Sequence, residues 1–214
     1  MGIKERKERE KEMRRRQIKN AAKEVFLVKG LKSATIEDIA GKAELSPATI
    51  YQYFKNKDEL YASLNLESLR FLLDEIKKVH KDDDLSVEEK IVNYKEAMYK
   101  TFQYDPIIFQ NILNVQLGNT LSSLSTDLLT QITNLSREVM NMLADTYKQG
   151  VKSGKFEEGN GIAHADIMWA MFLGLVLWED SKRKINPKKD FLKPTLDTAI
   201  KIFIQGVKKS ENKK

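Results

Sequence analysis

Helical periodicity runs through the whole chain and is the feature that most restricts its fold. Apolar residues recur at three- and four-residue intervals, and only four prolines and ten glycines interrupt the 214 residues. No window alternates apolar and polar residues for long, as strands would require, so the pattern favours an all-α protein. Long helices are expected over 4–29, with Gly30 as the stop, and over 87–104, 106–117, 120–153, 162–183 and 188–209.

The longest apolar run covers residues 167–178 and has 12 residues. A membrane-spanning helix needs roughly 20, so we expect a buried helix and no membrane segment. The first 16 residues are charged and no apolar segment follows them, which argues against a secretory signal. The chain has no cysteine, which excludes disulfides and thiolate metal sites. A cytoplasmic protein is the expected result.

Positive charge is concentrated at the N-terminal end. Residues 1–60 carry 15 Lys and Arg against 10 Asp and Glu, whereas residues 61–214 carry 22 against 21. This asymmetry favours an anionic partner, either nucleic acid or a membrane surface, for the first quarter of the chain. A basic tail that only aids solubility is the alternative.

The first 60 residues predict a helix-turn-helix, because short second and third helices follow one another across a tight turn. Thr35, with Asp38 three residues later, forms an aspartate version of the capping box. Ser46 followed by Pro47 is a typical helix start. The third helix, about 46–52, begins with small residues that permit close approach to a groove or a phosphate. In a helix-turn-helix this element lies in the DNA major groove.

A cluster of tyrosines and lysines follows that helix, and both residue types are good phosphate ligands. Residues 15–60 resemble the DNA-binding signature of the tetracycline-repressor-like (TetR/AcrR) family of regulators. The matching residues are Ile39-Ala40, Ala43, Ser46, Ala48-Thr49-Ile50-Tyr51, Tyr53-Phe54 and Lys57-Asp58-Glu59-Leu60. Glu44 departs from the pattern, since the family usually has glycine there. The remaining residues are similar only in the layout of their helices.

The resemblance implies two kinds of DNA contact. Phosphate contacts would come from Thr35, Tyr51, Tyr53 and Lys57, and base contacts from Pro47, Ala48, Thr49 and Gln52. Gln52 is the side chain suited to a bidentate adenine contact. Arg15 and Arg16, together with Arg14, form either an arm that reaches a groove or a solvated charged run. Ile50 and Phe54 are expected in the core, because so small a unit needs them.

A larger helical unit for effector binding and dimerisation is expected to follow, with the domains at 1–56 and 57–214. The 120–153 helix has two apolar stripes and the 167–178 run is apolar on every face. This is more apolar surface than one core can use, so we expect a homodimer through the 125–153 and 162–183 helices. Burial of both helices in one monomeric core is the alternative.

The resemblance also implies an effector cavity in the second domain. The candidate lining residues combine aromatic, amide and flexible apolar side chains, as suits a hydrophobic small molecule: Tyr94, Met98, Phe102, Gln103, Phe109, Asn114, Met142, Trp169 and Phe172. The same composition at helical spacing is typical of an ordinary core. An acyl chain, an acyl thioester or a hydrophobic drug would each fit.

We therefore expect a ligand-responsive transcriptional regulator, specifically a homodimeric repressor that a hydrophobic molecule releases from a palindromic double-stranded DNA operator. A constitutive architectural DNA-binding protein without an effector, or an activator of the same family, are the alternatives. An enzyme has little support, because His80 and His164 are 84 positions apart and no glycine-rich phosphate loop is present. No metal site and no cofactor are expected.

Overall fold

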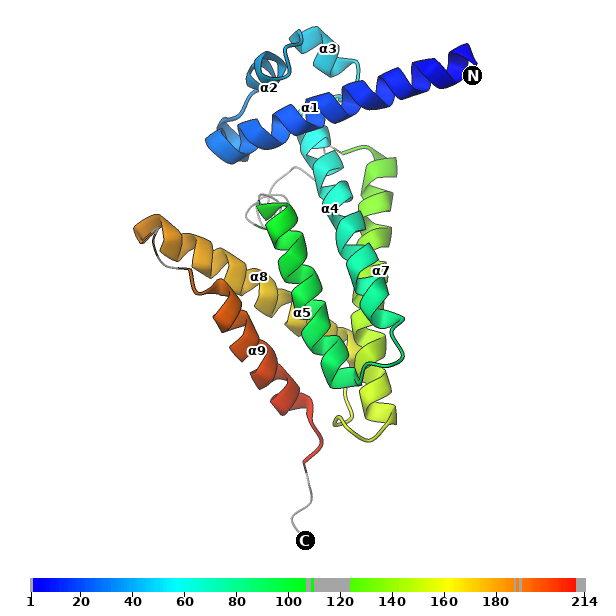
Figure 1. Cartoon of the computed structure of the whole chain (residues 1–214), viewed down its shortest axis with the longest axis vertical. Helices are drawn as coiled ribbons and strands as arrows, with labels where there is room; N and C mark the ends of the chain where they lie inside the picture. The colour runs from blue at the N-terminus through cyan, green and yellow to red at the C-terminus, as the bar shows by residue number, and fades with distance from the viewer. Residues whose placement is uncertain (1, 107–108, 110–123, 187, 189, 211–214) are drawn as a thin grey trace. The chain divides into compact units, whose positions relative to one another are not determined.

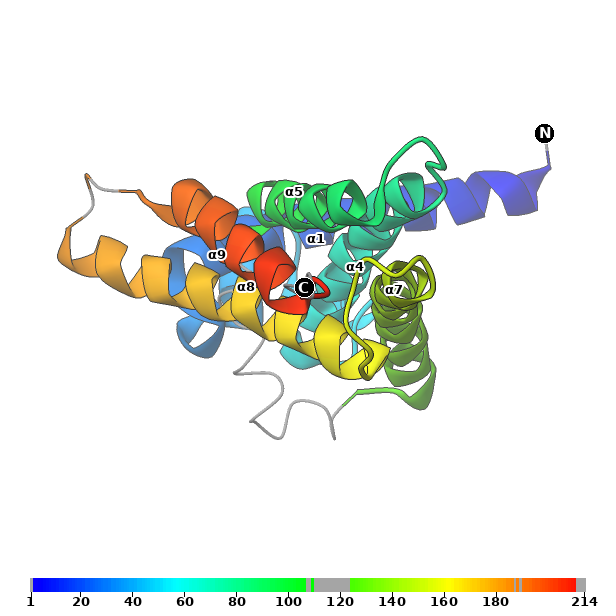
Figure 2. The same ribbon diagram turned by 90° about the horizontal axis from the view of Figure 1, so that it is seen from below.

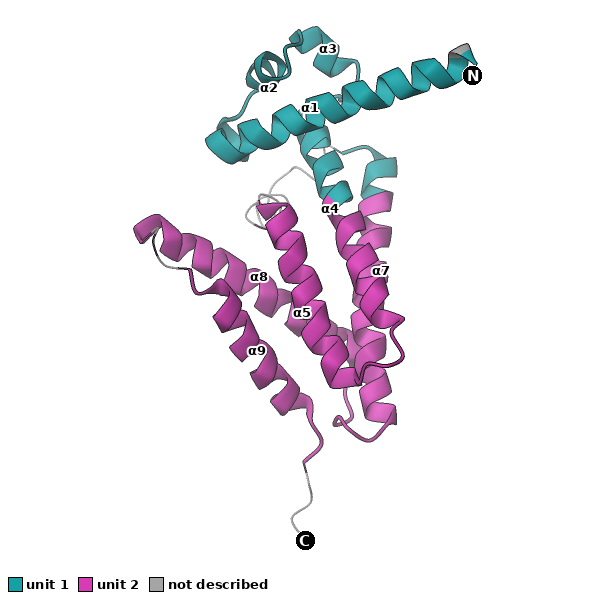
Figure 3. Cartoon of the chain, viewed as in Figure 1, with its two compact units in different colours: residues 1–67, 111–130 teal, residues 68–110, 131–214 magenta. Residues whose placement is uncertain are grey.

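The computed structural model describes residues 2–106, 109, 124–186, 188 and 190–210. In these ranges the regular structure is helical, apart from one isolated bridge between Phe156 and Lys208, which confirms the all-α prediction. The chain divides into two compact units (Figure 3), with residues 1–67 and 111–130 in unit 1 and residues 68–110 and 131–214 in unit 2. The domain boundary expected between residues 56 and 57 stays a prediction.

Unit 1 contains the helices labelled in Figure 1 as α1 (Ile3–Ser33), α2 (Ile36–Lys42) and α3 (Pro47–Tyr51). It also contains the beginning of α4 (Lys57–His80) and the first residues of α7 (Thr126–Lys152), as Figure 3 shows. Regular helical geometry in α1 is interrupted at Gly30, whose φ of 75° and ψ of 159° belong to a region that is essentially restricted to glycine. The predicted stop at Gly30 is therefore a break in α1, and a short turn continues to Ser33.

The most buried side chains of unit 1 come from α1 to α4 and from the turn before α4. Its most buried large side chains are at most 2% exposed: Ile18 and Phe26 of α1, Ile39 of α2, Ile50 of α3, Phe54, and Leu60 of α4. The rings of Phe26 and Tyr61 meet edge to face with centroids 5.7 Å apart. The burial of Ile50 and Phe54 confirms their predicted core role. The side of α3 opposite Ile50 is exposed to solvent.

Unit 2 contains the rest of α4 with α5 (Val87–Tyr104), most of α7 (Thr126–Lys152), α8 (Gly161–Ile185) and α9 (Leu192–Val207). Helix α9 packs against both α5 and α8 (Figure 2). The expected 87–104 helix is confirmed, and α8 and α9 match the expected helices within a few residues at each end. The expected 106–117 helix, except for residues 106 and 109, lies outside the described residues.

Helix α8 carries the long apolar run, and its own chain covers only one side of it. Met168, Phe172 and Val176 are at most 3% exposed, whereas Ile167 is 53% and Trp178 is 63% exposed. The sequence predicted a helix that is apolar on every face, with more apolar surface than one core can use, and the exposed side of α8 is apolar surface that its own chain leaves uncovered.

Candidate DNA interface

The turn between α2 and α3 accepts a side-chain hydrogen bond from α1 and contains an unusual backbone residue. Gln17 of α1 donates from Nε2 to the carbonyl of Ala43 at 2.7 Å, which satisfies the end of α2. Glu44 then adopts a φ of +55°, the left-handed conformation that glycine adopts readily and that L residues other than asparagine and aspartate rarely take. The glutamate that departs from the family pattern therefore keeps the backbone geometry for which glycine is usual.

Helix α3 begins as the sequence predicted. The Ser46 hydroxyl accepts a hydrogen bond from the Thr49 backbone N–H at 3.1 Å, and Pro47 occupies the first helical position. Ser46 Oγ and Thr49 Oγ1 are also 2.9 Å apart, so these hydroxyls are held against each other. A serine cap and a proline start explain how a helix of five residues forms at this place.

The residues expected to contact DNA surround the exposed side of α3. Pro47, Ala48 and Gln52 are exposed, and Tyr51 is 53% exposed although tyrosine is large and partly apolar. Thr49 and Tyr53 are half-buried. Unit 1 therefore presents small residues, one amide and one phenol together on a short helix whose other side is anchored by Ile50.

Thr35 is exposed at the start of α2, where it forms the reciprocal capping box that the sequence predicted. Its hydroxyl accepts from the Asp38 N–H at 3.1 Å, and the Asp38 carboxylate accepts from the Thr35 N–H at 3.1 Å. Lys29 donates to the same carboxylate at 2.6 Å. The hydrogen bond from Lys29, followed by that from the Thr35 backbone, lowers the pKa of Asp38. The negative charge at this helix start is therefore paired within the chain.

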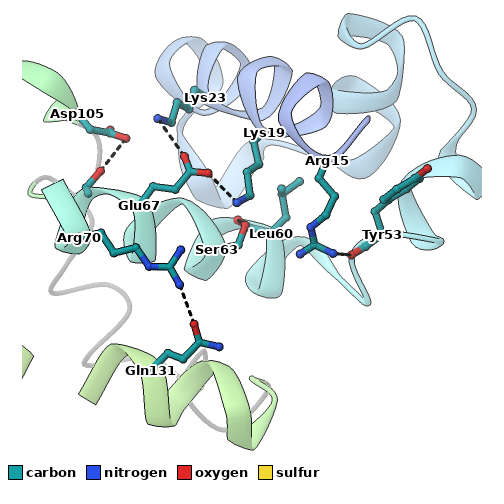
Figure 4. A network of polar contacts seen from close by, with 11 residues as sticks. Arg15, Lys19, Lys23, Tyr53, Leu60, Ser63, Glu67, Arg70, Asp105 and Gln131 are labelled. Carbon is teal, nitrogen blue, oxygen red and sulfur yellow. Dashed lines mark hydrogen bonds and ion pairs between the residues drawn. The ribbon is translucent and has the colours of Figure 1, made fainter. Parts of the chain in front are cut away.

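The two predicted arginines occupy different environments. Arg15 donates from Nη1 to the carbonyl of Tyr53 at 3.2 Å (Figure 4), and its guanidinium lies 4.7 Å from the centroid of the Phe54 ring. Arg15 thus packs against the segment that connects α3 to α4. Arg16 is exposed on α1. Of this pair, the side chain of Arg16 is the one that is presented to solvent.

Lys57, expected to contact phosphate, points its ammonium group at the end of α1. Nζ donates to the carbonyls of Leu31 at 2.7 Å, Ala34 at 2.7 Å and Lys32 at 3.3 Å. An ammonium group has three hydrogens to donate, so these carbonyls occupy its whole donor capacity. The contact was not anticipated from the sequence, because the lysine and its acceptors are 23 to 26 positions apart.

In unit 2, four of the expected effector residues form one aromatic cluster. The Phe109 ring centroid lies 6.0 Å from that of Phe102, 6.1 Å from Trp169 and 5.6 Å from Phe172. Trp169 is half-buried, whereas the three phenylalanines are at most 8% exposed. Rings from α5 and α8 thus pack around the Phe109 ring in unit 2.

The remaining expected effector residues are dispersed. Tyr94 is fully buried, and its hydroxyl lies 2.8 Å from Thr146 Oγ1 and 3.0 Å from His80 Nδ1. Burial raises the pKa of Tyr94 to about 12, so the phenol stays protonated. Met98 is fully buried, Met142 is half-buried, Gln103 is exposed, and Asn114 lies outside the described residues.

Comparison with known proteins finds a match to one family of regulators in the helix-turn-helix region. Residues 18–64, which span α1 to α4, match the family described as bacterial regulatory proteins, tetR family. The fatty acid metabolism regulator protein of Bacillus subtilis is 22% identical over 191 residues, covering 89% of this chain and 94% of the relative.

Solved structures agree over almost the full length. The TetR family regulator PfmR from Thermus thermophilus superposes with a TM-score of 0.70 at 21% identity, covering 91% of this chain and 97% of that one. FadR from Bacillus subtilis, solved with stearoyl-CoA, gives 0.67 at 22% identity, covering 89% and 98%. At this identity the structures establish the fold. Together with the tetR family match over residues 18–64, this likeness supports a DNA-binding transcriptional regulator.

Proposed function

We propose that the protein is a homodimeric repressor that binds a palindromic operator through α3 and is released by a molecule with an apolar chain. The exposed side of α3 carries this proposal, since Pro47, Ala48 and Gln52 face solvent while Ile50 on the opposite side anchors the helix. Gln52 can read adenine through a bidentate contact, and Tyr51 can fix the register by binding phosphate. Thr35, Thr49, Tyr53, Arg15 and Arg16 stay predicted contributors.

The apolar surface of α8 supports dimerisation. One exposed stripe at three- and four-residue spacing follows the helix: Ala163, Ile167, Ala170, Gly174 and Trp178. A Cβ placed on Gly174 would meet nothing within 4 Å, so the packing of its own chain does not require glycine there. A glycine in a helix costs roughly 1 kcal/mol relative to alanine, and close approach of a second helix is a reason to keep it.

The partner of α8 in the dimer is better assigned to α9 than to α7. The sequence suggested the 125–153 helix, but among the described residues the strongly exposed large apolar side chains after α5 belong to α8, α9 and the segment between them. Ile202 of α9 is 64% exposed, and Gly206, one turn later, also has open space beside it. By length and composition alone α8 is long and apolar enough to cross a membrane, a property that core helices of soluble proteins share. A two-fold bundle would cover the same stripe.

The aromatic cluster of Phe102, Phe109, Trp169 and Phe172 supports an effector with a long apolar chain. Apolar walls bind such a chain by removing it from water. A fatty acyl thioester is the class we favour, because the similar FadR of Bacillus subtilis was solved with stearoyl-CoA. Removing the second tryptophan with Trp178→Phe leaves Trp169 as the only indole in this chain. Stearoyl-CoA should then shift Trp169 emission to the blue, and coenzyme A alone should not; equal responses would exclude acyl-chain binding at the cluster.

Helix α4 is suited to transmit the effector signal, because it contributes residues to both units. Its Glu67 accepts from Lys19 of α1 at 2.7 Å, and one turn later Arg70 Nη2 donates to Gln131 of α7 at 3.0 Å (Figure 4). A shift of α4 relative to α7 would therefore also move Glu67, which contacts Lys19 of α1. The effector can lower operator affinity only by its preference for one of the two states.

In vitro selection from random DNA duplexes tests the core of the proposal. The wild type should enrich a two-fold symmetric sequence, and Gln52→Ala should bind it more weakly by about 5- to 150-fold per half-site while losing discrimination at one base pair of each half-site. Enrichment without symmetry, or equal binding by Gln52→Ala, would contradict the reading role of α3. Binding without enrichment would favour the architectural alternative.

A further inference from the structure

We propose that the N-terminal part of α1 binds the phosphate backbone of DNA outside the half-site that α3 reads. This role rests on the proposed DNA-binding function and extends it to a part of α1 that lies before residues 18–64, the segment that matches the tetR family. The contact surface is a line of four basic side chains, which we call the basic stripe: Lys4, Lys7, Lys11 and Arg14.

The basic stripe continues the buried face of α1. Residues three and four positions apart lie on one line along a helix. On this line the basic stripe is followed by Ile18, Ala21 and Val25, which are at most 9% exposed and anchor α1 in unit 1. Arg14 is half-buried, whereas the three lysines of the stripe are exposed. In Figure 1 the N-terminal end of α1 projects beyond α2 and α3, so the anchoring face becomes basic where it has no element of unit 1 to cover.

Hydrogen bonds at the base of the stripe show which side of α1 carries it. Arg14 Nη1 donates to Gln17 Oε1 at 2.8 Å, and Gln17 Nε2 donates to the carbonyl of Ala43, just after α2, at 2.7 Å. The neighbouring Arg15 donates to the carbonyl of Tyr53, just after α3. This side of α1 therefore faces the helix-turn-helix. A duplex that lies on α3 would have the lysines of the stripe beside it.

The charge of the basic stripe is available to an external anion. Within the described part of the chain, no side chain pairs with the ammonium groups of its three lysines, and the nearby ion pair joins Arg6 to Glu10. The glutamates of residues 4–12 fall on other lines of the helix. Four cations over ten residues are spaced about 5 Å apart along the helix axis. One strand of a duplex carries a phosphate every 3.4 Å or so, which is a similar linear density of charge.

The composition of this segment favours DNA over a membrane surface. Residues 4–12 contain no apolar residue. A helix that lies on a membrane buries an apolar face among the lipids, and this segment has no such face. A phosphate backbone requires only cations that can reach it. Because phosphate contacts carry no sequence information, the stripe would add affinity without adding selectivity.

The salt dependence of binding to a mixed-sequence duplex is the first test. Each lost phosphate contact lowers the slope of log affinity against log salt by about 0.9, so the double variant Lys7→Gln, Lys11→Gln should lose about 1.8 per protomer. The matched control is Arg6→Gln, Arg9→Gln, which removes the same charge about 200° around the same helix. It should stay close to the wild-type slope. Equal slopes for the two double variants would overturn the proposal.

Duplex length tests the position of the contact. Two duplexes carry the selected site, one ending at the site and one extended by about 15 base pairs, or about 50 Å, on each side. The wild type should bind the longer duplex at least about tenfold more tightly at about 50 mM salt, and Lys7→Gln, Lys11→Gln should lose this preference. Equal binding of both duplexes by the wild type would contradict contacts outside the half-site. Failure to select any site would contradict the proposed function, and the salt test would still decide the role of the stripe.

Vesicles decide between the two kinds of anionic partner. The wild type should bind neither phosphatidylcholine vesicles nor mixed phosphatidylcholine and phosphatidylserine vesicles at about 150 mM salt, where exposed charges are screened over about 8 Å. Binding to the mixed vesicles that Lys7→Gln, Lys11→Gln abolishes, together with an unchanged slope on DNA, would assign the stripe to a membrane surface and refute the proposal.

Discussion

Replacing Glu44 with glycine should stabilise unit 1. Glu44 holds a φ of +55°, and the left-handed conformation costs an ordinary L residue roughly 1–2 kcal/mol. Glycine removes this strain, but it also gives the unfolded chain more backbone freedom, which lowers the free energy of unfolding by about 0.5–1 kcal/mol. The free energy of unfolding should therefore rise by about 0.5–1 kcal/mol.

Hydrogen exchange measured by mass spectrometry suits this prediction, because both tryptophans lie in unit 2 and give no signal from α2 and α3. A gain near the upper end of the range corresponds to about fivefold slower exchange in amides of residues 36–54 that exchange through opening of unit 1. Peptides from α5 provide an internal reference and should not change.

Glu44→Ala is the matched control for the loss of the carboxylate. Alanine keeps the Cβ and therefore the strain, so its exchange should stay close to that of the wild type. Equal slowing in the alanine and glycine variants would show that charge removal is the cause. Faster exchange in Glu44→Gly would refute the argument that this residue is strained.

Three further outcomes concern the backbone of unit 1, the dimer and the response to acid. Gly30→Ala should destabilise unit 1 by about 1–3 kcal/mol in urea unfolding, because the φ and ψ of Gly30 disfavour a residue with a Cβ. Gly41→Ala lies inside α2 with open space around it and should stabilise unit 1 by about 0.5–1 kcal/mol. Similar changes in the two variants would contradict the backbone argument. Trp178→Glu should shift the protein from dimer to monomer in sedimentation equilibrium without loss of helical circular dichroism, and a persistent dimer would move the interface elsewhere. The hydrogen bond from Lys95 lowers the pKa of Asp197, so this pair stabilises the fold above the ordinary carboxyl pKa of 3.8 and stops doing so as pH falls through the lowered value. Asp197→Asn should flatten the acid limb of thermal stability, and an unchanged acid limb would exclude this contribution.

Local signals were enough to predict the elements of unit 1. Thr35 and Ser46 cap their helices through side chains three residues from the groups they bind, and such spacing is visible in the sequence. The burial of Ile50 and Phe54 follows from the period of apolar residues in a small unit. The short recognition helix and its exposed side were therefore predictable.

Contacts between distant residues were not predictable in the same way. Gln17 and Lys57 each find carbonyl acceptors 26 positions away, and no periodicity encodes such a pairing. The packing of Arg15 on Phe54, 39 positions further along the chain, was not visible in the sequence either. The exposed stripe of α8 and the exposed Ile202 of α9 also needed the fold, because the sequence of an apolar helix does not tell which side its own chain covers.

Footprinting on the selected duplex at about 50 mM and about 200 mM salt tests the central claim most directly. A dimer that reads DNA through α3 should protect two symmetric half-sites with centres at least about 34–36 Å apart, and the pattern should survive the higher salt. Gln52→Ala should lose this protection first. Weak protection without symmetry that disappears at the higher salt would mean that charge alone drives binding, and would contradict sequence recognition by this protein.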